Sequence, residues 1–438
     1  MTTLVLRNAT ILTLDRQDRL LDPGAIVVRN GLIEAVLDGD APAGDVTLDM
    51  SGRLIMPGLV NAHTHTPMVL FRGLSEGHSL LTLEGWYNTI RVWEEVMDGE
   101  MVPPAVAVSC AEMIRTGTTC FADQYFYMDR IVPVVRQSGM RAALAYGVVE
   151  LGDERARNLA MQETETFLQS LAGDERIHGW IGPHAFFVDN TPETIALELA
   201  LADRYDTGMH IHLSTTGEED AHCFAHYGRS AVQQMKELGI LELPVMAAHC
   251  LTIPPEDFAT LAAHDFTAVI AASACMRAGA TAAPLRAMRD AGIRTALGTD
   301  NVANNNSYDL FNEMETLGKL MSFREGQPGA VTAKEIVEMA TLGGARALGL
   351  EEKIGSLEVG KVADLITLDL DNIGWGPRAG QDLYTALVYA INGLAVQDVM
   401  VEGEWLLRNT KWTTLDYKSE RHKLESAHHE LRSRRQNH

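Results

Sequence analysis

The sequence predicts an α/β fold: a central (β/α)₈ TIM barrel with a small β-sandwich domain built from both termini. Three observations support this: β-rich runs at each end, eight short apolar runs between them, and helix-like segments separating those runs. Eight βα units in roughly 290 residues match a closed barrel better than an open sheet. The expected boundaries are 1–57 plus 355–415 for the β-domain, 58–354 for the barrel, and 416–438 for a polar C-terminal helix or tail.

Both ends of the chain read as short strands with tight turns. Within residues 3–57, β-rich runs are broken by pairs such as Asn30-Gly31 and Ser51-Gly52. Residues 363–370 and 397–409 have the same character, with Glu402-Gly403 as a turn. We expect the two ends to pair in one small sheet domain, which would bring the N-terminal and C-terminal segments together.

The middle of the chain alternates apolar strands with helical patterns. The eight candidate strands are residues 59–65, 118–124, 141–147, 177–185, 209–215, 244–250, 267–273 and 294–300. Thr191-Pro192 predicts the start of a helix, because threonine caps helix N-termini and proline suits the first turn. Thr332 and Glu335 have the spacing of a capping box at the start of a later helix.

Histidines gather where the predicted strands end. His63 and His65 lie two apart, so the strand period points both side chains to one face. The ends of strands four, five, six and eight carry His184, His212, His249 and Asp300. Because active sites of such barrels lie at this end, the pattern predicts a divalent metal with open positions for water. His210 is interpreted as a hydrogen-bonded structural residue that points away from the ligand face.

The composition limits the kinds of molecule that the protein is expected to bind. The 438 residues carry a net charge of −23, which argues against nucleic acid and anionic membrane surfaces. The sequence contains no apolar run of about 18 residues and no secretory signal pattern. Five widely spaced cysteines predict free thiols in a reducing compartment. We therefore expect a cytoplasmic protein that acts on a small molecule.

The motifs resemble the amidohydrolase superfamily. The likeness covers nearly the whole chain and is carried by PGLVNAHTH (Pro57–His65), HIHLS, AAHC, LGTDN, ATLGGARALGL and IGSLEVGKVADLITLD. These are most similar to the branch that holds triazine hydrolases and S-adenosylhomocysteine/5′-methylthioadenosine deaminases. The resemblance implies a metal-dependent aminohydrolase that adds water to an sp² carbon of an N-heterocyclic or nucleoside-like substrate and releases ammonia. It also implies a homo-oligomer.

The resemblance implies a ligand set, residue by residue. The metal ligands would be His63, His65, His212 and Asp300. Asp300 would also accept the proton of the attacking water, and His249 would be a second-sphere residue or weak fifth ligand that assists catalysis. Strand four offers no lysine to bridge a second ion, so one divalent metal is expected. Zn²⁺ is favoured, and Fe, Mn or Co would also suit such a site.

One position on strand five departs from the branch pattern. The branch carries a glutamate three residues after the strand-five histidine, where this chain has Thr215. A hydroxyl cannot act as a general acid near pH 7 as a carboxyl can. Three alternatives stay open: Glu218 or Glu219 swings in from a loop that Gly217 makes flexible, the substrate needs no such proton, or the enzyme is a poor deaminase. A solvated acidic loop is the favoured interpretation of residues 218–220.

Substrate-side residues are assigned by resemblance. The candidates are Trp86, Gln124, His184, Thr215 and Cys275. Trp86 or Trp93 could stack on a planar ring, and Cys275 stands where the family often has an asparagine. Arg155 and Arg157 could hold a substrate carboxylate, although ordinary surface arginines are the favoured interpretation.

Two other functions remain open. One is a hydrolase of the same superfamily that cleaves a chloro- or alkylamino-triazine, a urea, a carbamate or an amide. The other is a non-catalytic binding protein, which the complete ligand set argues against.

Overall fold

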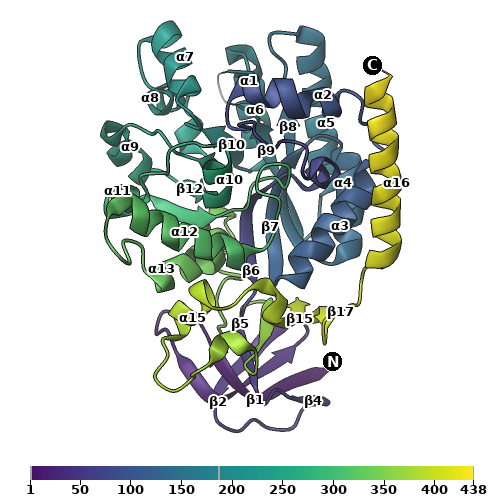
Figure 1. The fold of residues 1–438 in the computed structure, drawn as a ribbon, viewed down its shortest axis with the longest axis vertical. Helices are drawn as coiled ribbons and strands as arrows, with labels where there is room; N and C mark the ends of the chain where they lie inside the picture. The colour runs from purple at the N-terminus through teal and green to yellow at the C-terminus, as the bar shows by residue number, and fades with distance from the viewer. Residues whose placement is uncertain (1, 186–187, 438) are drawn as a thin grey trace.

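The larger part of the molecule is an eight-stranded parallel sheet curled into a barrel (Figure 1). The computed structural model describes residues 2–185 and 188–437. Neighbouring strands follow chain order around the sheet: β6 (Leu59–Thr64), β7 (Thr118–Tyr125), β8 (Arg141–Val148), β9 (Ile177–Pro183), β10 (Met209–Leu213), β11 (Val245–His249), β12 (Phe266–Ile270) and β13 (Arg294–Leu297). All eight predicted strands are confirmed.

The first and last strands meet at their C-terminal ends. Asp300 N donates to His63 O at 3.0 Å, and Thr299 N donates to Asn61 Oδ1 at 3.0 Å. Gly298 permits this approach, because a Cβ there would lie 2.8 Å from the Cβ of His63. The closure therefore places the LGTD motif directly against the H-x-H motif.

The smaller part is one mixed sheet formed by both ends of the chain, below the barrel in Figure 1. β14 pairs antiparallel with β5, which confirms that the two ends share a sheet. The sheet order is β17-β16-β15-β14-β5-β1-β2-β3, with β4 beside β1. Its strands are β1 (Thr3–Leu12), β2 (Leu20–Arg29), β3 (Leu32–Asp38), β4 (Val46–Asp49), β5 (Arg53–Pro57), β14 (Leu365–Asp369), β15 (Val396–Val401), β16 (Glu404–Arg408) and β17 (Lys411–Trp412).

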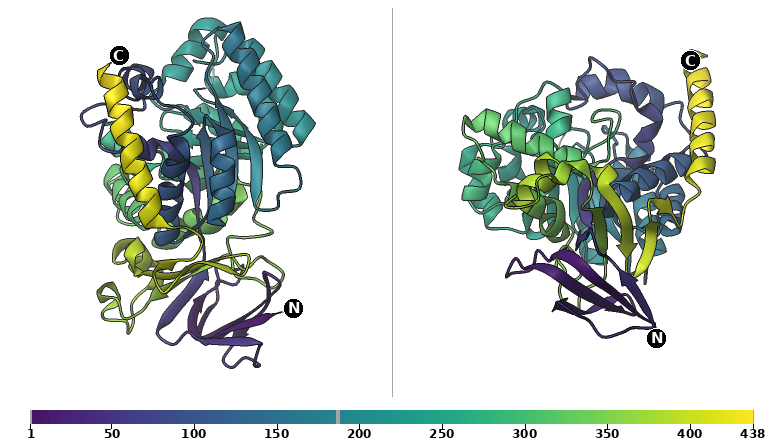
Figure 2. Two further views of the ribbon diagram at one scale, coloured as in Figure 1. Left: turned by 90° about the vertical axis from the view of Figure 1, so that its right-hand side faces the viewer. Right: turned by 60° about the horizontal axis from the view of Figure 1, so that its bottom comes forward.

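Helices surround the barrel and follow its strands (Figures 1 and 2). They are α1 (Leu83–Trp86), α2 (Val92–Glu94), α3 (Val102–Arg115), α4 (Met128–Ser138), α5 (Glu154–Ser170), α6 (Pro192–Tyr205), α7 (Glu218–Tyr227), α8 (Ala231–Glu237), α9 (Phe258–Ala262), α10 (Ala272–Arg277), α11 (Leu285–Asp290), α12 (Leu310–Glu325), α13 (Ala333–Glu338), α14 (Gly344–Ala347), α15 (Leu383–Tyr389) and α16 (Tyr417–Gln436). Single turns of other helix types are η1 (Thr66–Phe71), η2 (Tyr87–Arg91), η3 (Ile240–Glu242), η4 (Pro255–Asp257), η5 (Met339–Gly343), η6 (Ile373–Trp375) and η7 (Gly393–Ala395). Among the described residues, no helix is both long and apolar enough to span a bilayer.

Both predicted helix starts are found. The Thr332–Glu335 capping box forms, with Glu335 N donating to Thr332 Oγ1 at 3.3 Å and Thr332 N to Glu335 Oε2 at 2.7 Å. α6 begins at Pro192 as expected. The Thr191 hydroxyl contacts Thr194 Oγ1 at 3.1 Å and makes no bond to a backbone N–H of that helix.

The C-terminal segment is the helix α16, which lies along α3 on the side of the barrel (Figure 2). Leu431 is fully buried against the core, and Ala427 is 9% exposed. His428 Nδ1 lies 2.8 Å from Leu70 O, and Arg434 pairs with Asp98 at 2.6 Å. Of the two expectations for this segment, helix or frayed tail, the structure shows the helix, and apolar contacts hold it in place.

A buried ion pair links the barrel to the terminal sheet. Arg141 Nε on β8 lies 3.0 Å from Asp364 Oδ2, which immediately precedes β14, and both side chains are 2% exposed. Asp364 Oδ1 also accepts from Glu402 N at 2.8 Å, so one carboxylate joins three segments.

Replacing Arg141 by methionine is expected to lower the free energy of unfolding by about 3–5 kcal/mol, because Asp364 would keep a buried charge without its cation. Urea unfolding followed by circular dichroism measures the change. Arg421→Met is the matched control, since this arginine is 60% exposed in its pair with Glu425 and should leave stability nearly unchanged. A loss equal to that of the control would contradict the assignment.

Candidate metal centre

Two imidazoles come from the end of β6. The Nε2 atoms of His63 and His65 lie 3.5 Å and 3.4 Å from Asp300 Oδ1. The two ring centroids are 4.7 Å apart, with the rings nearly perpendicular. Asp300 follows β13, so the barrel closure described above brings this carboxylate to the histidines.

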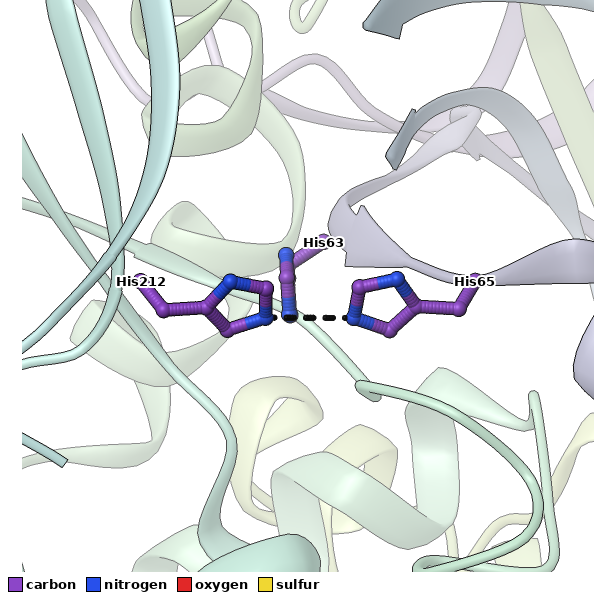
Figure 3. Close-up of side chains that lie close together, drawn as sticks. All are labelled: His63, His65 and His212. Carbon is purple, nitrogen blue, oxygen red and sulfur yellow. Dashed lines mark hydrogen bonds between the residues drawn. The ribbon is translucent and has the colours of Figure 1, made fainter. Parts of the chain in front are cut away.

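His212 supplies a third imidazole from β10. Its Nε2 lies 3.2 Å from the Nε2 of His65, and these two rings are within 7° of parallel. Figure 3 shows these two rings with their Nε2 atoms facing each other and the His63 ring seen edge-on close to both. Potential donor atoms of His63, His65 and His212 lie within 4.8 Å of one another, as do those of His63, His249 and Asp300. The structure thus gathers the four predicted ligands and His249 at one point.

Backbone carbonyls orient two of these rings. Nδ1 of His65 lies 2.6 Å from Gln124 O, and Nδ1 of His212 lies 2.8 Å from His184 O. A carbonyl only accepts, so each Nδ1 carries the proton and donates it. Each Nε2 is then left with a lone pair that faces the centre, as is typical of metal-binding histidines.

His210 takes part in the same arrangement, so its prediction as a residue pointing away from the ligands is wrong. Side chains two apart in a strand share a face, which puts His210 on the same side as His212. Its Nε2 lies 2.7 Å from Nδ1 of His63, and the residue is fully buried. His210 therefore orients His63 from within the barrel.

Burial sets the protonation states of the cluster. Burial lowers the pKa of His63 to about 3 and also lowers the pKa values of His212 and His249. Burial opposes ionisation of Asp300, but the adjacent imidazoles of His63, His65 and His249 hold the pKa of this carboxyl well below its usual range. Burial disfavours the charged form of His65, but the adjacent Asp300 raises the pKa of this imidazole overall. The cluster therefore offers three neutral imidazoles and a carboxylate, the forms that bind metal.

Buried atoms without hydrogen-bond partners suit a cation site. His63 Nε2, His249 Nδ1 and Asp300 Oδ2 are buried without a hydrogen-bond partner. Such atoms are costly unless a ligand satisfies them. His249 (φ 76°) and Asp300 (φ 59°) also have left-handed backbones, a strain that clusters at functional sites. The donor set of nitrogens and one carboxylate fits a divalent transition metal.

A cavity opens onto this cluster. Its described lining includes four of the five predicted substrate-side residues, namely Trp86, Gln124, His184 and Thr215, together with His65, His212, His249 and Asp300. The Trp86 ring lies 4.8 Å from the His184 ring at a 34° tilt. Leu83 N donates to Glu218 Oε2 at 3.0 Å, so the α1 segment is fastened to the start of α7 above the cavity.

His184 and Gln124 make different contacts in the lining of the cavity. Nδ1 of His184 lies 2.7 Å from Asp189 Oδ2, which leaves Nε2 for a ligand. The Gln124 amide donates to Pro183 O at 3.2 Å and to His210 O at 2.8 Å. Gln124 thus ties the ends of β9 and β10 together, and only its unpartnered Oε1 is left for a ligand.

Glu94 is a cavity residue that sequence reasoning missed. It is 7% exposed, and Tyr125 Oη donates to its Oε1 at 2.7 Å. Its Oε2 has no hydrogen bond, and the nearest cation is Arg91 Nη1 at 3.6 Å. Burial raises the pKa of this carboxyl. The adjacent Glu95 is exposed, and nothing in the sequence distinguishes the two glutamates.

Three predicted candidates lie elsewhere. Cys275 is not among the described lining residues, and its Sγ contacts Ala272 O at 3.1 Å inside α10. Burial raises the pKa of this thiol to about 12, which also makes it a poor nucleophile. Arg155 and Arg157 lie on the outer helix α5 and do not line the cavity. No lysine or arginine is among its described lining residues.

The acidic segment after β10 is not a solvated loop. Glu218 begins α7, and Glu219 and Asp220 are 2% and 9% exposed. Gly217, with φ of +87°, turns the chain so that the helix starts beside Thr215. Glu218 and Glu219 both line the cavity.

Known proteins resemble this chain both in sequence and in structure. A model described as "Amidohydrolase family" matches residues 54–406. A 5′-deoxyadenosine deaminase of Methanosarcina acetivorans is 33% identical over 99% of both chains. A 5-methylthioadenosine/S-adenosylhomocysteine deaminase of Moorella thermoacetica is 37% identical over 86% of this chain and 88% of that one. The crystal structure of an adenosine deaminase from Xanthomonas campestris with bound zinc superposes with a TM-score of 0.91 at 28% identity, covering 98% of each chain.

Proposed function

Because the chain belongs to the amidohydrolase family, we propose that it removes ammonia from an adenosine derivative with an uncharged 5′ substituent. The enzyme is a metal-dependent hydrolase of the deaminase type. The observation that carries the substrate proposal is the cavity: it has a cluster of potential metal ligands at its floor, and its wall holds an aromatic ring and the buried carboxyl of Glu94, whose Oε2 has no hydrogen bond.

Zinc is the ion we propose. His63, His65, His212 and Asp300 would hold it, with His249 as the neighbouring fifth group. The zinc-bound relative and the nitrogen-rich donor set support this choice. Bound there, a divalent ion would supply Lewis acidity and lower the pKa of a water molecule to about 7.

The protein groups would divide the remaining work. The unpaired Oδ2 of Asp300 is placed to accept a proton from the attacking water and later to give it to the departing amine. The unpartnered Nδ1 of His249 would contact the oxygen that adds to the ring carbon. Burial of both groups excludes bulk water and strengthens these interactions.

The walls suit a nucleoside. Trp86 offers a face for a planar purine, and Glu94 and His184 offer groups that bind sugar hydroxyls. The described lining includes no cation to pair with the carboxylate of an amino-acid tail. A buried unpaired charge is costly, so a substrate such as S-adenosylhomocysteine would bind poorly.

Ammonia release from a panel tests this proposal. We expect the zinc-loaded enzyme to act on 5′-deoxyadenosine and 5′-methylthioadenosine with at least ~10-fold higher kcat/KM than on S-adenosylhomocysteine, since one unpaired buried charge costs more than 1.4 kcal/mol. Aminotriazines, chlorotriazines, guanine and pterins complete the panel. Silence towards every adenosine derivative would contradict the proposal, and activity confined to triazines would favour the alternative leaving group.

We also propose a cytoplasmic location and a homo-oligomeric state. The five cysteines are free and buried, which suits a reducing cytoplasm. The family resemblance supports a homo-oligomer.

A further inference from the structure

We propose that Thr215 and Glu219 form a two-residue proton relay, in which Glu219 stores the proton and the Thr215 hydroxyl passes it to the ring nitrogen of the substrate. This inference rests on the proposed deaminase function and assigns the acid that the sequence of β10 lacks.

The two side chains touch each other at the edge of the cavity. Thr215 Oγ1 lies 3.2 Å from Glu219 Oε1, a contact in which the hydroxyl donates to the carboxylate and the carboxyl, once protonated, donates to the hydroxyl. Thr215 N donates to the same oxygen at 3.4 Å. Both residues line the cavity that contains His212 and Asp300. Gly217 makes this possible, because its left-handed backbone folds the first turn of α7 back onto residue 215.

The carboxyl of Glu219 is placed to hold a proton. It is 2% exposed, its Oε2 has no hydrogen-bond partner, and no cation of the described residues is among the groups that act on it. Its titratable neighbours are acidic: Asp220 and Cys223 on α7, and Cys250 after β11. Burial raises the pKa of Glu219 to about 7, and the charge of Asp220 adds to this effect.

A hydroxyl can serve as the link because it donates and accepts at once. In the forward step, the Thr215 O–H proton bonds to the ring nitrogen, and the Glu219 O–H proton moves to Thr215 Oγ1, which leaves Glu219 as a carboxylate. The product keeps its proton on the ring nitrogen. Asp300 takes both protons of the attacking water in turn: it passes the first to the departing amine and releases the second, from the hydroxyl of the adduct, to solvent. Solvent returns one proton to Glu219, so the protein regains its starting state.

The first experiment measures turnover of 5′-deoxyadenosine by zinc-loaded variants. Glu219→Gln and Thr215→Val are isosteric and each breaks the relay, so we expect kcat to fall about 10²–10⁴-fold, with KM nearly unchanged. Thr215→Ser restores the hydroxyl and should recover most of the rate. Glu193→Gln is the matched control, because Glu193 holds the same position in the first turn of α6 but is exposed.

The pH profile adds a readout that a structural role would not move. The stored proton is present below the pKa of Glu219, so kcat/KM of the wild type should fall as pH rises through about 7. Glu219→Gln should lack this limb of the profile.

A second readout does not depend on activity. Infrared difference spectra of wild type minus Glu219→Gln should contain the carbonyl band of a protonated carboxyl group at pH 6, and this band should disappear at pH 8. An ionised Glu219 at pH 6 would overturn the proton store.

The failures can be told apart. A wild type that deaminates no adenosine derivative refutes the proposed function, whereas an active wild type with an equally active Glu219→Gln variant refutes the relay alone. Thr215→Glu gives the remaining check: a rise in kcat of about tenfold or more would mean that the native pair leaves the proton transfer unassisted.

Discussion

Replacing Asp300 by asparagine is expected to lower kcat/KM for 5′-deoxyadenosine by about 10⁴-fold, the upper end of what general acid–base groups contribute. In the proposed site, the change removes two functions at once. Oδ1 lies 3.5 Å and 3.4 Å from the Nε2 atoms of His63 and His65, where it completes the ligand cluster, and Oδ2 is unpaired and buried. An amide carries no charge for the ion and accepts a proton poorly.

Steady-state kinetics with metal content measured on the same samples would check this. Asp290→Asn is the control, since Asp290 is an exposed residue at the end of α11. Circular dichroism should show that both variants are folded. A loss below about tenfold with full metal content would remove Asp300 from the proton path.

Replacing His212 by alanine is expected to abolish metal binding and, with it, turnover. His212 contributes one of the three imidazoles that face a common point, and its ring is already oriented by His184 O. The cavity left by alanine would not restore a nitrogen donor. Elemental analysis and competition with a chelator measure the metal affinity.

Variants of two further histidines provide an intermediate case and a control. His210→Leu should weaken metal binding about 10–100-fold, the usual effect of removing a group that orients a ligand, because His63 would lose its Nδ1 partner. His429→Gln, on the exposed face of α16, should change nothing. Equal metal content in the His212→Ala variant and the wild type would contradict the assigned site.

The sequence predicted the architecture well because the relevant signals are local. Each barrel strand is a short apolar run followed by a helix-like segment, and such a pattern is decided within a dozen residues. The H-x-H pair could be read in the same way, since the period of a strand alone puts His63 and His65 on one face. The same rule, applied to His210, would have placed it inside the barrel beside His212.

Sequence reasoning missed or misplaced residues whose role is decided by whether their side chains are buried in the cavity. Glu94 and Glu95 are adjacent and identical, yet one is 7% exposed in the cavity and the other faces solvent. Cys275 stood at a family position of interest, but α10 turns its sulfur onto Ala272 O. Glu94 is held by Tyr125, which comes from a distant segment, whereas the sulfur of Cys275 is held by a turn of its own helix.

The sequence by itself determined that strands and helices alternate, that both ends are β-rich, and which histidines and aspartate stand at strand ends. The tertiary structure alone decided which side chains meet. His63 and His210 are 147 positions apart and touch, and the barrel closure sets Asp300 against His63. The tertiary structure also decided that the acidic run after β10 begins a helix and does not form a solvent-facing loop. The carboxyl of Glu219 in this run is buried against Thr215. The physical reason is that periodicity follows from the local backbone, whereas desolvation and contact depend on everything packed around a residue.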